Sequence, residues 1–567
     1  MGLGCMRLST DPERDEALAR ATIAAALDAG ITVFDTAHAY GRDETELGHN
    51  ERLLASALRE SGAHTRARIV TKGGMTRPGG AWLPDGRAKS ILRDCEASLE
   101  ALDGLAIDLY LLHAPDPRTP WRTPLRALAR LLDERLVRHV GLSNVNRPQL
   151  DEALTLIPIT AIQVALGPLD DRPLRAGLVE RCADRGIAVI AHSPLGGPRR
   201  AGGLARRRPI TEVARASGAT PAEIALAWLL DLDPAIVAIP GARRPQTARS
   251  AARAATLELD PEARDKLRRE LGGSRPVTTG RRSHGEVVMV IGVPGAGKTR
   301  AAEEYVGRGY IRLNRDERGG ALRDLARALD DELSNGARRV VLDNTYLTRA
   351  SRSYVIETAA RHGISTRCVW LDTPLAAAQV NLVERLLDEL GALPAPEELR
   401  ELARNRSGVL APTSQMRTVR ELEPPSTDEG FTHVEKIEFA RAPSPGRARS
   451  GVFVAAAALE REGWERAIAD GDTGAPHLLF HWSPNGDPEA LDDAVVDLQR
   501  RTTGPVERAL CPHPAGPPIC WCRPPLPGLA LAFARAHGLD PARSVLIGTG
   551  PAHRNLAAAL GARYLPA

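Results

Sequence analysis

The sequence predicts an α/β protein whose chain folds as a (β/α)8 TIM barrel, then a P-loop α/β domain, then a small α/β domain with a cysteine-rich loop. Three observations support this prediction. Short apolar runs alternate with helix-like segments seven or eight times between residues 19 and 271, as parallel strands with crossover helices require. The run GVPGAGKT at residues 292–299 lies between a short apolar strand and a helix-like segment. The last 115 residues or so alternate in the same way around the run CPHPAGPPICWC.

The length and composition of the chain indicate a soluble globular protein of several domains. Its 567 residues exceed what one hydrophobic core usually organises, and 43% hydrophobic with 26% charged residues is typical of globular folds. No apolar run approaches the roughly 18 residues of a membrane-spanning helix, and the N-terminus does not resemble a secretion signal, so we expect a cytoplasmic protein. A formal net charge of +4 is too small to indicate nucleic-acid binding by itself. Seven cysteines without a secretion signal argue against a disulfide scaffold.

Two stretches rich in Gly, Ser, Pro, Thr and Arg divide the chain. The first, GGSRPVTTGRRSHG, covers residues 272–285, and the second, RAPSPGRARS, covers residues 441–450. Such compositions favour linkers over packed elements. We therefore expect domains at residues 1–271, 286–440 and 451–567.

Four polar side chains follow predicted strands of the barrel, at the ends where (β/α)8 barrels place their active sites. Asp35 and Tyr40 stand in FDTAHAYG, Lys72 in IVTKGG and His113 in LYLLHAPDP. Reduction of a carbonyl by a nicotinamide hydride needs a proton donor at the oxygen, and a tyrosine serves when a neighbouring lysine lowers its pKa from about 10. A carboxylate keeps that lysine charged, and a histidine orients the substrate oxygen. The set therefore predicts carbonyl reduction.

With this tetrad, residues 1–270 resemble the aldo-keto reductase family. The resemblance implies a nicotinamide cofactor, NADP(H), with NAD left open because the residues after Pro245 depart from the family pattern. It also implies cofactor contacts in the segments GLSN, AIQV, AHSPLGG and IPGARRP, from Ser143, Asn144, Gln163, His192, Ser193, Leu195, Gly241, Ala242 and Arg243. His192 stands where the family usually stacks an aromatic ring on the nicotinamide. A barrel that binds the cofactor without catalysis is the alternative.

A phosphate-binding loop follows the first predicted strand of the second domain. GVPGAGKT fits the pattern G-x-x-x-x-G-K-[ST], in which glycines let backbone N–H groups surround phosphates, the lysine reaches the terminal phosphates and the last residue binds Mg2+. The residues predicted to hold ATP are Gly292, Gly295, Ala296, Gly297, Lys298 and Thr299, with Lys298 also catalytic and Thr299 also the Mg2+ ligand. The loop predicts nucleotide binding and leaves the acceptor open.

Residues 286–439 resemble the kinase domain of the 5'-hydroxyl polynucleotide kinases in the segments NRDERGG, VVLDNTYLTRASR and TPLAAAQVNLVERLL. The resemblance implies that Asp316 is the general base for the acceptor hydroxyl, and that Arg385 on a lid helix grips the donor phosphates. It also implies that Arg318 meets a substrate phosphate and that Asp343 holds substrate or metal. Many P-loop kinases share a strand-end aspartate and a lid arginine, so a small-molecule kinase is the alternative.

The run CPHPAGPPICWC brings three thiols and an imidazole close together in the sequence. These candidate ligands are Cys511, His513, Cys520 and Cys522. Two close pairs of such donors around a Pro-Gly turn fit the closed tetrahedral shell of a structural zinc site. Such a metal would contribute on the order of 10 kcal/mol to the folding of a small domain. Buried cysteines without a metal are the alternative.

Residues 450–567 resemble the haloacid-dehalogenase-type (HAD) phosphatases that carry a zinc loop. That family attacks phosphate with an aspartate after its first strand, whereas this chain reads GVFVAAAA there, without a carboxylate. Pro524 replaces the family's lysine, and Gly548 with Thr549 replaces its late Gly-Asp pair. Because nucleophile, phosphate-binding lysine and magnesium carboxylate are all missing, we do not expect phosphatase activity. The domain is predicted to be a degenerate HAD-like scaffold or binding module.

The combination of domains suggests a function. A phosphatase-like domain joined to a polynucleotide kinase is the layout of enzymes that heal broken nucleic-acid ends. We hypothesise a bifunctional repair enzyme, which reduces aldehydes of damaged DNA or RNA, such as abasic or 3'-aldehydic sugars, and phosphorylates 5'-hydroxyl ends. A generic aldehyde reductase fused to a small-molecule kinase is one alternative. A cofactor-sensing regulatory protein with a zinc tether is another.

Overall fold

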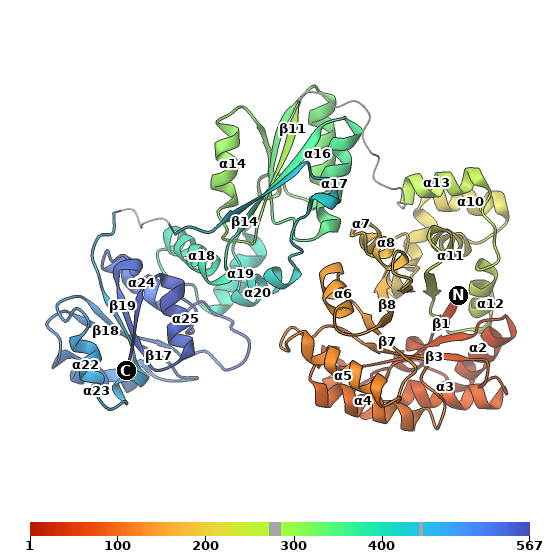
Figure 1. Ribbon diagram of the computed structural model, residues 1–567, viewed down its shortest axis with the longest axis horizontal. Helices are drawn as coiled ribbons and strands as arrows, with labels where there is room; N and C mark the ends of the chain where they lie inside the picture. Colours follow the sequence, from red (N-terminus) through yellow and green to blue (C-terminus); the bar gives the residue numbers. More distant parts are fainter. Residues whose placement is uncertain (272–284, 407, 442–445) are drawn as a thin grey trace. The chain divides into compact units, whose positions relative to one another are not determined.

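The computed structural model describes residues 1–271, 285–406, 408–441 and 446–567 (Figure 1). The chain divides into two compact units, Met1–Pro276 and Val277–Ala567. The predicted linker at 272–285 lies outside the described residues except for Gly285, and residues 442–445 of the predicted linker at 441–450 lie outside them as well. None of the helices in the described ranges is long and apolar enough to cross a membrane.

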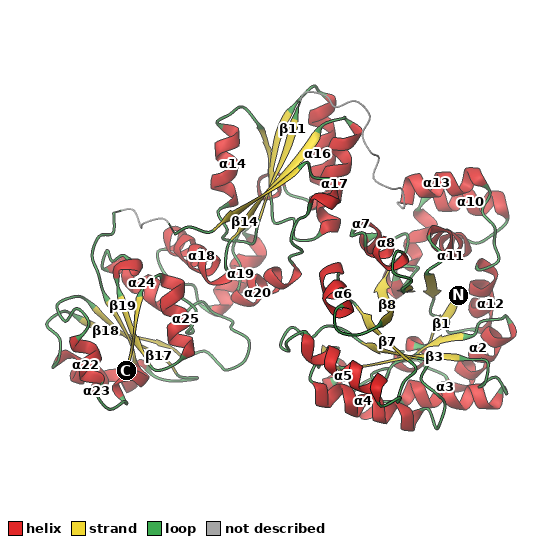
Figure 2. Ribbon diagram, in the orientation of Figure 1, coloured by secondary structure: helices red, strands yellow, loops and turns green. Residues whose placement is uncertain are grey.

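The first unit is a barrel of eight parallel strands in the order β1-β2-β3-β6-β7-β8-β9-β10 (Figure 2). A parallel bridge between Gly4 and Gly241 brings the last strand back to the first, where the Gly4 N–H donates to the Pro240 oxygen at 3.1 Å. The strands are β1 (Gly2–Gly4), β2 (Val33–Asp35), β3 (Arg68–Gly73), β6 (Leu109–Leu112), β7 (His139–Ser143), β8 (Ile159–Ala165), β9 (Ala188–His192) and β10 (Ile236–Ile239). The predicted (β/α)8 barrel is confirmed.

Helices cover the outside of the barrel. They are α1 (Met6–Thr10), α2 (Glu16–Asp28), α3 (His49–Glu60), α4 (Ala88–Ala101), α5 (Arg122–Asp133), α6 (Arg147–Leu154), α7 (Arg172–Arg175), α8 (Leu178–Ala183), α9 (Gly197–Arg200), α10 (Arg208–Ser217), α11 (Pro221–Leu232), α12 (Pro245–Ala254) and α13 (Pro261–Leu271). In α5 the side chains of Leu125, Leu128 and Leu131 are fully buried at a spacing of three residues, so one face packs inward. A short antiparallel hairpin of β4 (Met75–Thr76) and β5 (Leu83–Pro84) follows β3.

The P-loop domain is a parallel sheet in the order β12-β13-β11-β14-β15. Its strands are β11 (Glu286–Ile291), β12 (Ile311–Leu313), β13 (Arg339–Asp343), β14 (Ser365–Asp372) and β15 (His433–Glu438). Its helices are α14 (Lys298–Val306), α15 (Arg315–Arg318), α16 (Leu322–Ser334), α17 (Arg349–Arg361), α18 (Leu375–Leu390), α19 (Pro396–Asn405) and α20 (Pro412–Glu421). Residues Val287 to Ile291 of the central strand are fully buried, as their continuous apolar run predicts. The phosphate loop therefore starts from the most protected strand of the sheet.

The C-terminal domain is a second parallel sheet, in the order β18-β17-β16-β19-β20. Its strands are β16 (Val452–Ala455), β17 (His477–Trp482), β18 (Val506–Cys511), β19 (Val545–Gly548) and β20 (Arg563–Pro566). Its helices are α21 (Ala456–Leu459), α22 (Trp464–Ala469), α23 (Asp492–Gln499), α24 (Gly528–Ala536) and α25 (Pro551–Leu560). The strand order reverses between β16 and β19, which makes the carboxyl ends of these two strands the expected ligand position.

The two sheets of the second unit share a hydrophobic core through α18. Val383 and Leu387 of α18 belong to one buried cluster with Leu531 of α24 and Leu556 of α25. Figure 1 shows α18 lying beside α24 and α25. Helix α18 is the segment for which sequence resemblance implied a lid, so the predicted lid helix packs against the C-terminal domain.

Candidate active sites

A buried network joins the four residues predicted for carbonyl reduction. Asp35 ends β2 and Lys72 lies in the adjacent strand β3, so the sheet sets these side chains next to each other. The Lys72 Nζ donates to Asp35 Oδ1 at 2.8 Å and to the Tyr40 hydroxyl at 3.0 Å. The ring of His113, which follows β6, packs edge to face against Tyr40 with 5.7 Å between ring centroids. The structure thus brings all four side chains into one site.

Burial and charge set the protonation states of this network. Burial acts to lower the pKa of Lys72, but Asp35 and Tyr40 more than offset it, so the pKa lies above its ordinary value. Burial raises the pKa of Tyr40 to about 12, outweighing the lowering by Lys72 that the sequence predicts. Burial, reinforced by the charge of Lys72, holds the pKa of His113 well below its ordinary value. At neutral pH the site presents a charged lysine, a neutral imidazole and a protonated phenol.

Two amide side chains predicted to bind the nicotinamide are bonded to this network. Gln163 Nε2 donates to Asp35 Oδ1 at 2.6 Å, so the carboxylate accepts from both Gln163 and Lys72. Asn144 Nδ2 donates to the backbone oxygen of His113 at 3.0 Å. Asn144 adopts a φ of 59°, a left-handed conformation that asparagine tolerates better than most residues. The tetrad and the predicted nicotinamide side chains therefore form one hydrogen-bonded group.

His192, Ser143 and Ser193 extend this polar group. His192 Nε2 lies 3.2 Å from Asn144 Oδ1, and its Nδ1 lies 3.2 Å from the Ser193 hydroxyl. Ser143 accepts a hydrogen bond from Asn144 Nδ2 at 3.1 Å. Burial lowers the pKa of His192 to about 4, so its ring is neutral at physiological pH. The structure brings His192 to the site in the place where the family resemblance put an aromatic ring.

The remaining residues predicted to contact the cofactor lie on the loops after β9 and β10. Leu195 packs against the core of the barrel, Ala242 is buried, and Gly241 is exposed. Arg243 Nη1 donates to Asp11 Oδ2 at 2.8 Å. The Arg243 side chain remains 37% exposed in this ion pair, which leaves part of the guanidinium accessible.

Two side chains that the sequence analysis missed stand on the β4–β5 hairpin. The ring centroid of Trp82 lies 6.1 Å from that of Tyr40 and 5.9 Å from that of His113. The guanidinium of Arg77 lies 3.7 Å from the centroid of the Trp82 ring. A signal was present, because GGMTRPGGAWLPDG directly follows the strand of Lys72 at the active-site end of the barrel.

The phosphate loop joins β11 to α14. Gly295 and Gly297 adopt φ values of 87° and 89°, which residues with a Cβ rarely adopt. Lys298 Nζ donates to the backbone oxygens of Gly292 and Val293, each at 3.0 Å. Burial lowers the pKa of Lys298 to about 8. The lysine therefore lies over the loop with an ammonium group whose charge depends on pH near neutrality.

Helix α18 packs directly on this loop. A Cβ on Gly295 would lie 2.3 Å from the backbone oxygen of Ala378 in α18, so only glycine fits here. Asn381 Nδ2 donates to the Gly295 oxygen at 2.8 Å. Ala296 is half-buried, and Thr299 is exposed in the first turn of α14. The side chain predicted to bind Mg2+ is thus accessible.

The predicted general base lies within electrostatic reach of the phosphate loop. Asp316 is exposed on α15, and its backbone N–H donates to Asn314 Oδ1 at 2.6 Å. The charges of Asp316 and Arg385 both act on the pKa of Lys298. Arg318, predicted to meet a substrate phosphate, is exposed on the same short helix α15.

Two charged residues of the segment VVLDNTYLTRASR are engaged inside the protein. Asp343, predicted to hold substrate or metal, is 2% exposed and accepts from Arg312 Nε at 2.9 Å and Nη2 at 2.7 Å. A substrate or metal would have to replace Arg312 at this carboxylate. Arg352 is fully buried and donates to both carboxylate oxygens of Glu429 at 2.7 Å, so it has a structural role.

Arg385 links the lid helix to the segment that follows α19. Its Nη2 donates to the backbone oxygen of Gly408, and its side chain is 46% exposed. Two residues further on, the Leu410 oxygen accepts from Trp521 Nε1 at 3.0 Å. Trp521 is 1% exposed and stands between two predicted zinc ligands in the sequence. The C-terminal domain therefore contacts the segment against which Arg385 is held.

Comparisons with known proteins match the barrel and the P-loop domain. The model of the Aldo/keto reductase family matches residues 1–269, and a model described as AAA domain matches residues 287–406. An uncharacterized oxidoreductase of Schizosaccharomyces pombe is 30% identical over 276 residues, which cover 48% of this chain and 86% of that protein. This chain belongs to the aldo/keto reductase family.

Further aldo-keto reductases match the same part of the chain. One from Strobilurus tenacellus is 29% identical over 267 residues, covering 42% of this chain and 76% of that protein. A crystal structure of aldo/keto reductase from Klebsiella pneumoniae in complex with NADP and acetate is 27% identical, covers 48% of this chain and 90% of that one, and has a TM-score of 0.41. The AAA domain match makes residues 287–406 a P-loop, kinase-like domain joined to the reductase.

The four predicted zinc ligands converge at the end of β18. The Sγ atoms of Cys511, Cys520 and Cys522 lie 3.2 to 3.7 Å apart, and His513 Nδ1 lies within 3.4 Å of two of them. These separations exclude a disulfide, whose sulfurs are about 2.05 Å apart. Two sulfurs on a tetrahedral zinc with Zn–S bonds of about 2.3 Å are about 3.8 Å apart. The separation between Cys511 and Cys520 matches this value, and the other two are about 0.5 Å shorter. All four ligand atoms lie within 4.8 Å of one another.

The described segments that directly follow β16 and precede α25, residues 456–459 and 548–549, carry no acidic side chain. β16 runs into α21, where the residues from Ala456 to Leu459 carry no carboxylate. After β19 the chain has Gly548 and Thr549, and the Thr549 N–H donates to His553 Nδ1 at 3.1 Å. The position expected to attack phosphate is therefore occupied by alanines, as the sequence indicates.

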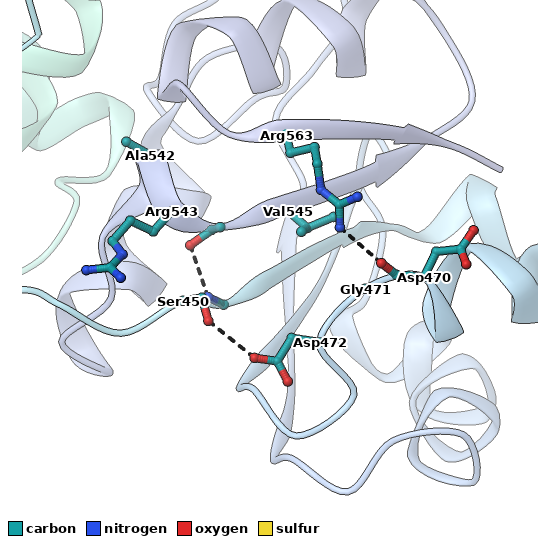
Figure 3. A pocket seen from close by; sticks show the side chains of 10 residues that line it. Ser450, Asp470, Gly471, Asp472, Ala542, Arg543, Val545 and Arg563 are labelled. Atoms are coloured by element: carbon teal, nitrogen blue, oxygen red, sulfur yellow. Dashed lines mark hydrogen bonds between the residues drawn. The ribbon is translucent and has the colours of Figure 1, made fainter.

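A pocket of about 390 Å³ lies at the opposite edge of this sheet (Figure 3). Gly451 and Ser544 line it just before β16 and β19, and Arg563 begins β20. Figure 3 shows the Arg563 guanidinium directed at the backbone oxygen of Asp470, to which it donates at 3.0 Å. Ligand sites of parallel sheets lie at the carboxyl ends of the strands, so this pocket at the amino ends is not equivalent to a phosphatase site.

Proposed function

We propose that the barrel reduces an aldehyde with NADP(H). The observation that carries this is the Lys72 ammonium, which contacts both Asp35 and the Tyr40 hydroxyl while His113 packs on the same phenol. When bound, the nicotinamide supplies a hydride to the carbonyl carbon. Tyr40 gives its phenolic proton to the carbonyl oxygen, and the product is the alcohol. Lys72, held charged by Asp35, stabilises the phenolate that remains.

His113 and the surrounding amides fit a bound nicotinamide and carbonyl. His113 Nδ1 is buried without a hydrogen-bond partner, and the ring is neutral, so its Nε2 or Nδ1 hydrogen is available to orient the substrate oxygen. Ser143, Asn144 and Gln163 supply the donors and acceptors that a carboxamide needs. The exposed part of Arg243 is the proposed contact for a 2'-phosphate, which favours NADP(H) over NAD.

The P-loop domain is proposed to phosphorylate 5'-hydroxyl ends with ATP and Mg2+. In this reaction the Lys298 ammonium and the Arg385 guanidinium neutralise the donor phosphates, and Asp316 takes the proton of the acceptor hydroxyl. The charges of Asp316 and Arg385 both reach Lys298, which supports one site for all three. Thr299, exposed at the start of α14, is the proposed Mg2+ ligand.

Together the two activities suggest repair of broken nucleic-acid ends, with DNA or RNA as the partner. The reductase would convert the aldehyde of an abasic or 3'-aldehydic sugar to an alcohol, and the kinase would restore the opposite 5'-phosphate. One experiment tests the combination. NADPH with an oligonucleotide bearing an abasic or 3'-aldehydic end, and ATP with a 5'-hydroxyl oligonucleotide, should both react. If neither reacts while small aldehydes are reduced, the repair function is wrong and a general aldehyde reductase remains.

The C-terminal domain is proposed to be a scaffold for the kinase lid, stabilised by structural Zn2+. Its candidate ligands Cys511, His513, Cys520 and Cys522 have the donor types and spacing of a closed zinc shell. Trp521 lies between two of them and bonds to Leu410, next to the segment that holds Arg385. The domain would thereby support phosphate transfer without a reaction of its own.

A further inference from the structure

Arg77 is a buried cation that forms no ion pair with any residue in the described part of the chain. It is 5% exposed, and its Nη2 donates to the backbone oxygen of Arg42 at 2.7 Å. Its Nε and Nη1 are buried without a hydrogen-bond partner. Asp43 acts on its pKa from a distance, but that carboxylate accepts hydrogen bonds from Thr45, and burial still lowers the pKa of Arg77. Two charged donors are therefore left unmet.

Such an arrangement is costly for a folded protein. Buried polar groups are nearly always hydrogen-bonded, and buried charges are nearly always paired. The other buried arginine of the described residues, Arg352, follows this rule, because Glu429 and three backbone oxygens meet its guanidinium. Arg77 differs in that its guanidinium lies on the ring of Trp82, which in turn neighbours Tyr40 and His113. Unpaired charges near a reaction centre are typical of ligand-binding groups.

Trp82 connects Arg77 to the tetrad. Arg77 directly follows β4 and Trp82 directly precedes β5, so both lie in the connection of the β4–β5 hairpin. The guanidinium of Arg77 stacks on the indole of Trp82 at 3.7 Å from the ring centroid. The indole in turn lies about 6 Å, between ring centroids, from both Tyr40 and His113. Stacking uses the face of the guanidinium and leaves the N–H groups at its edges for an acceptor. The charge of Arg77 also acts on His113, which places it within electrostatic reach of the reacting oxygen.

We propose that Arg77 binds an anionic group of the aldehyde substrate, with Trp82 as the apolar wall between that anion and the carbonyl. This inference rests on the proposed reductase function and narrows its substrate class. The substrate is an aldehyde that carries a phosphate or carboxylate a few bonds from the carbonyl carbon, since guanidinium donors form their strongest hydrogen bonds with these groups. A sugar aldehyde next to a strand phosphate has this chemistry.

Paired substrates test the proposal in the full chain. Succinic semialdehyde is compared with butanal, and glyceraldehyde 3-phosphate with glyceraldehyde, so that carboxylate and phosphate are separated. Arg77→Met should lower kcat/KM for the preferred anionic aldehyde roughly tenfold to hundredfold, mainly through KM, and change the neutral aldehydes little. Arg77→Lys should restore part of the loss. Arg87→Met, which removes an exposed arginine of the same loop, is the matched control.

The outcomes are distinct. Equal kcat/KM of the native protein for anionic and neutral aldehydes overturns the Arg77 proposal and leaves the reductase intact. An equal loss on both kinds of aldehyde in Arg77→Met and in Arg77→Gln, with NADPH affinity and melting temperature unchanged, also overturns it. Selective loss on small anionic aldehydes supports it even if damaged oligonucleotides are not substrates. Absence of any aldehyde reduction removes the proposed reductase function and this inference with it.

Discussion

Replacement of Lys72 and Asp35, singly and together, tests whether the buried pair organises the reductase site. Lys72→Met leaves the Asp35 carboxylate, 2% exposed, with Gln163 as its remaining side-chain donor. Asp35→Asn leaves the fully buried ammonium of Lys72 with an amide, the Thr36 oxygen and the Tyr40 hydroxyl. Removal of one partner of a buried ion pair costs about 3–5 kcal/mol, because an uncompensated charge stays buried.

The double variant buries neither charge. Its loss of unfolding free energy should therefore be smaller than the sum of the two single losses, by about 1–3 kcal/mol. Urea unfolding of the full chain measures this, with loss of NADPH binding marking the transition of the barrel. Each single variant should also lower kcat of aldehyde reduction by about 100-fold or more. Lys72→Met removes the cation that stabilises the Tyr40 phenolate, and Asp35→Asn removes the carboxylate that keeps this cation charged. Losses that add to within about 0.5 kcal/mol would refute the pairing.

Three other predictions concern the separate sites. Tyr40→Phe should abolish aldehyde reduction while NADPH and ATP binding persist. Because the pKa of Tyr40 is raised to about 12, kcat/KM of the native protein should not fall between about pH 7 and 9. A steep fall of kcat/KM in this range would contradict the assignment of Tyr40 as proton donor. The pKa of Lys298 is lowered to about 8, so its positive charge is lost as pH rises through that value. Calorimetry should therefore show that ATP binding weakens above pH 8 in the native protein, and that this pH dependence is absent in Lys298→Arg. Trp521→Ala should weaken ATP binding several-fold without loss of the zinc proposed at the cysteine cluster. Trp464→Ala, in a different core cluster of the same domain, should leave ATP binding unchanged.

The tetrad could be predicted from the sequence because three of its members lie in or directly after strands, and Tyr40 follows the strand of Asp35. Asp35 ends one strand, Lys72 lies in the next and His113 follows a third, and parallel strands of a barrel carry their ends to a common face. Arg77 and Trp82 could not be predicted in the same way. Their contact depends on how a Gly-rich hairpin folds over the barrel, which no periodic pattern specifies.

Ion pairs between neighbouring strands of a sheet could also not be predicted from the sequence. Arg312 reaches Asp343 only because β12 lies beside β13 in the P-loop sheet, and strand order cannot be read from two segments separated by a helix. The pKa of Tyr40 is a similar case. The sequence supplies the neighbouring cation, whereas the burial that outweighs it arises from the packing of the whole site.

The position of α18 gives the C-terminal domain a structural role next to the phosphate loop. One face of α18 supports the phosphate loop, where Ala378 touches Gly295 and Asn381 bonds to it. Another set of α18 residues is apolar, including Val383, and these side chains pack against α24 and α25 of the C-terminal domain. Without the C-terminal domain this apolar surface of α18 would be exposed to water, which costs roughly 25 cal/mol of free energy per Å². The packing face of the C-terminal domain therefore stabilises the helix that supports the phosphate loop.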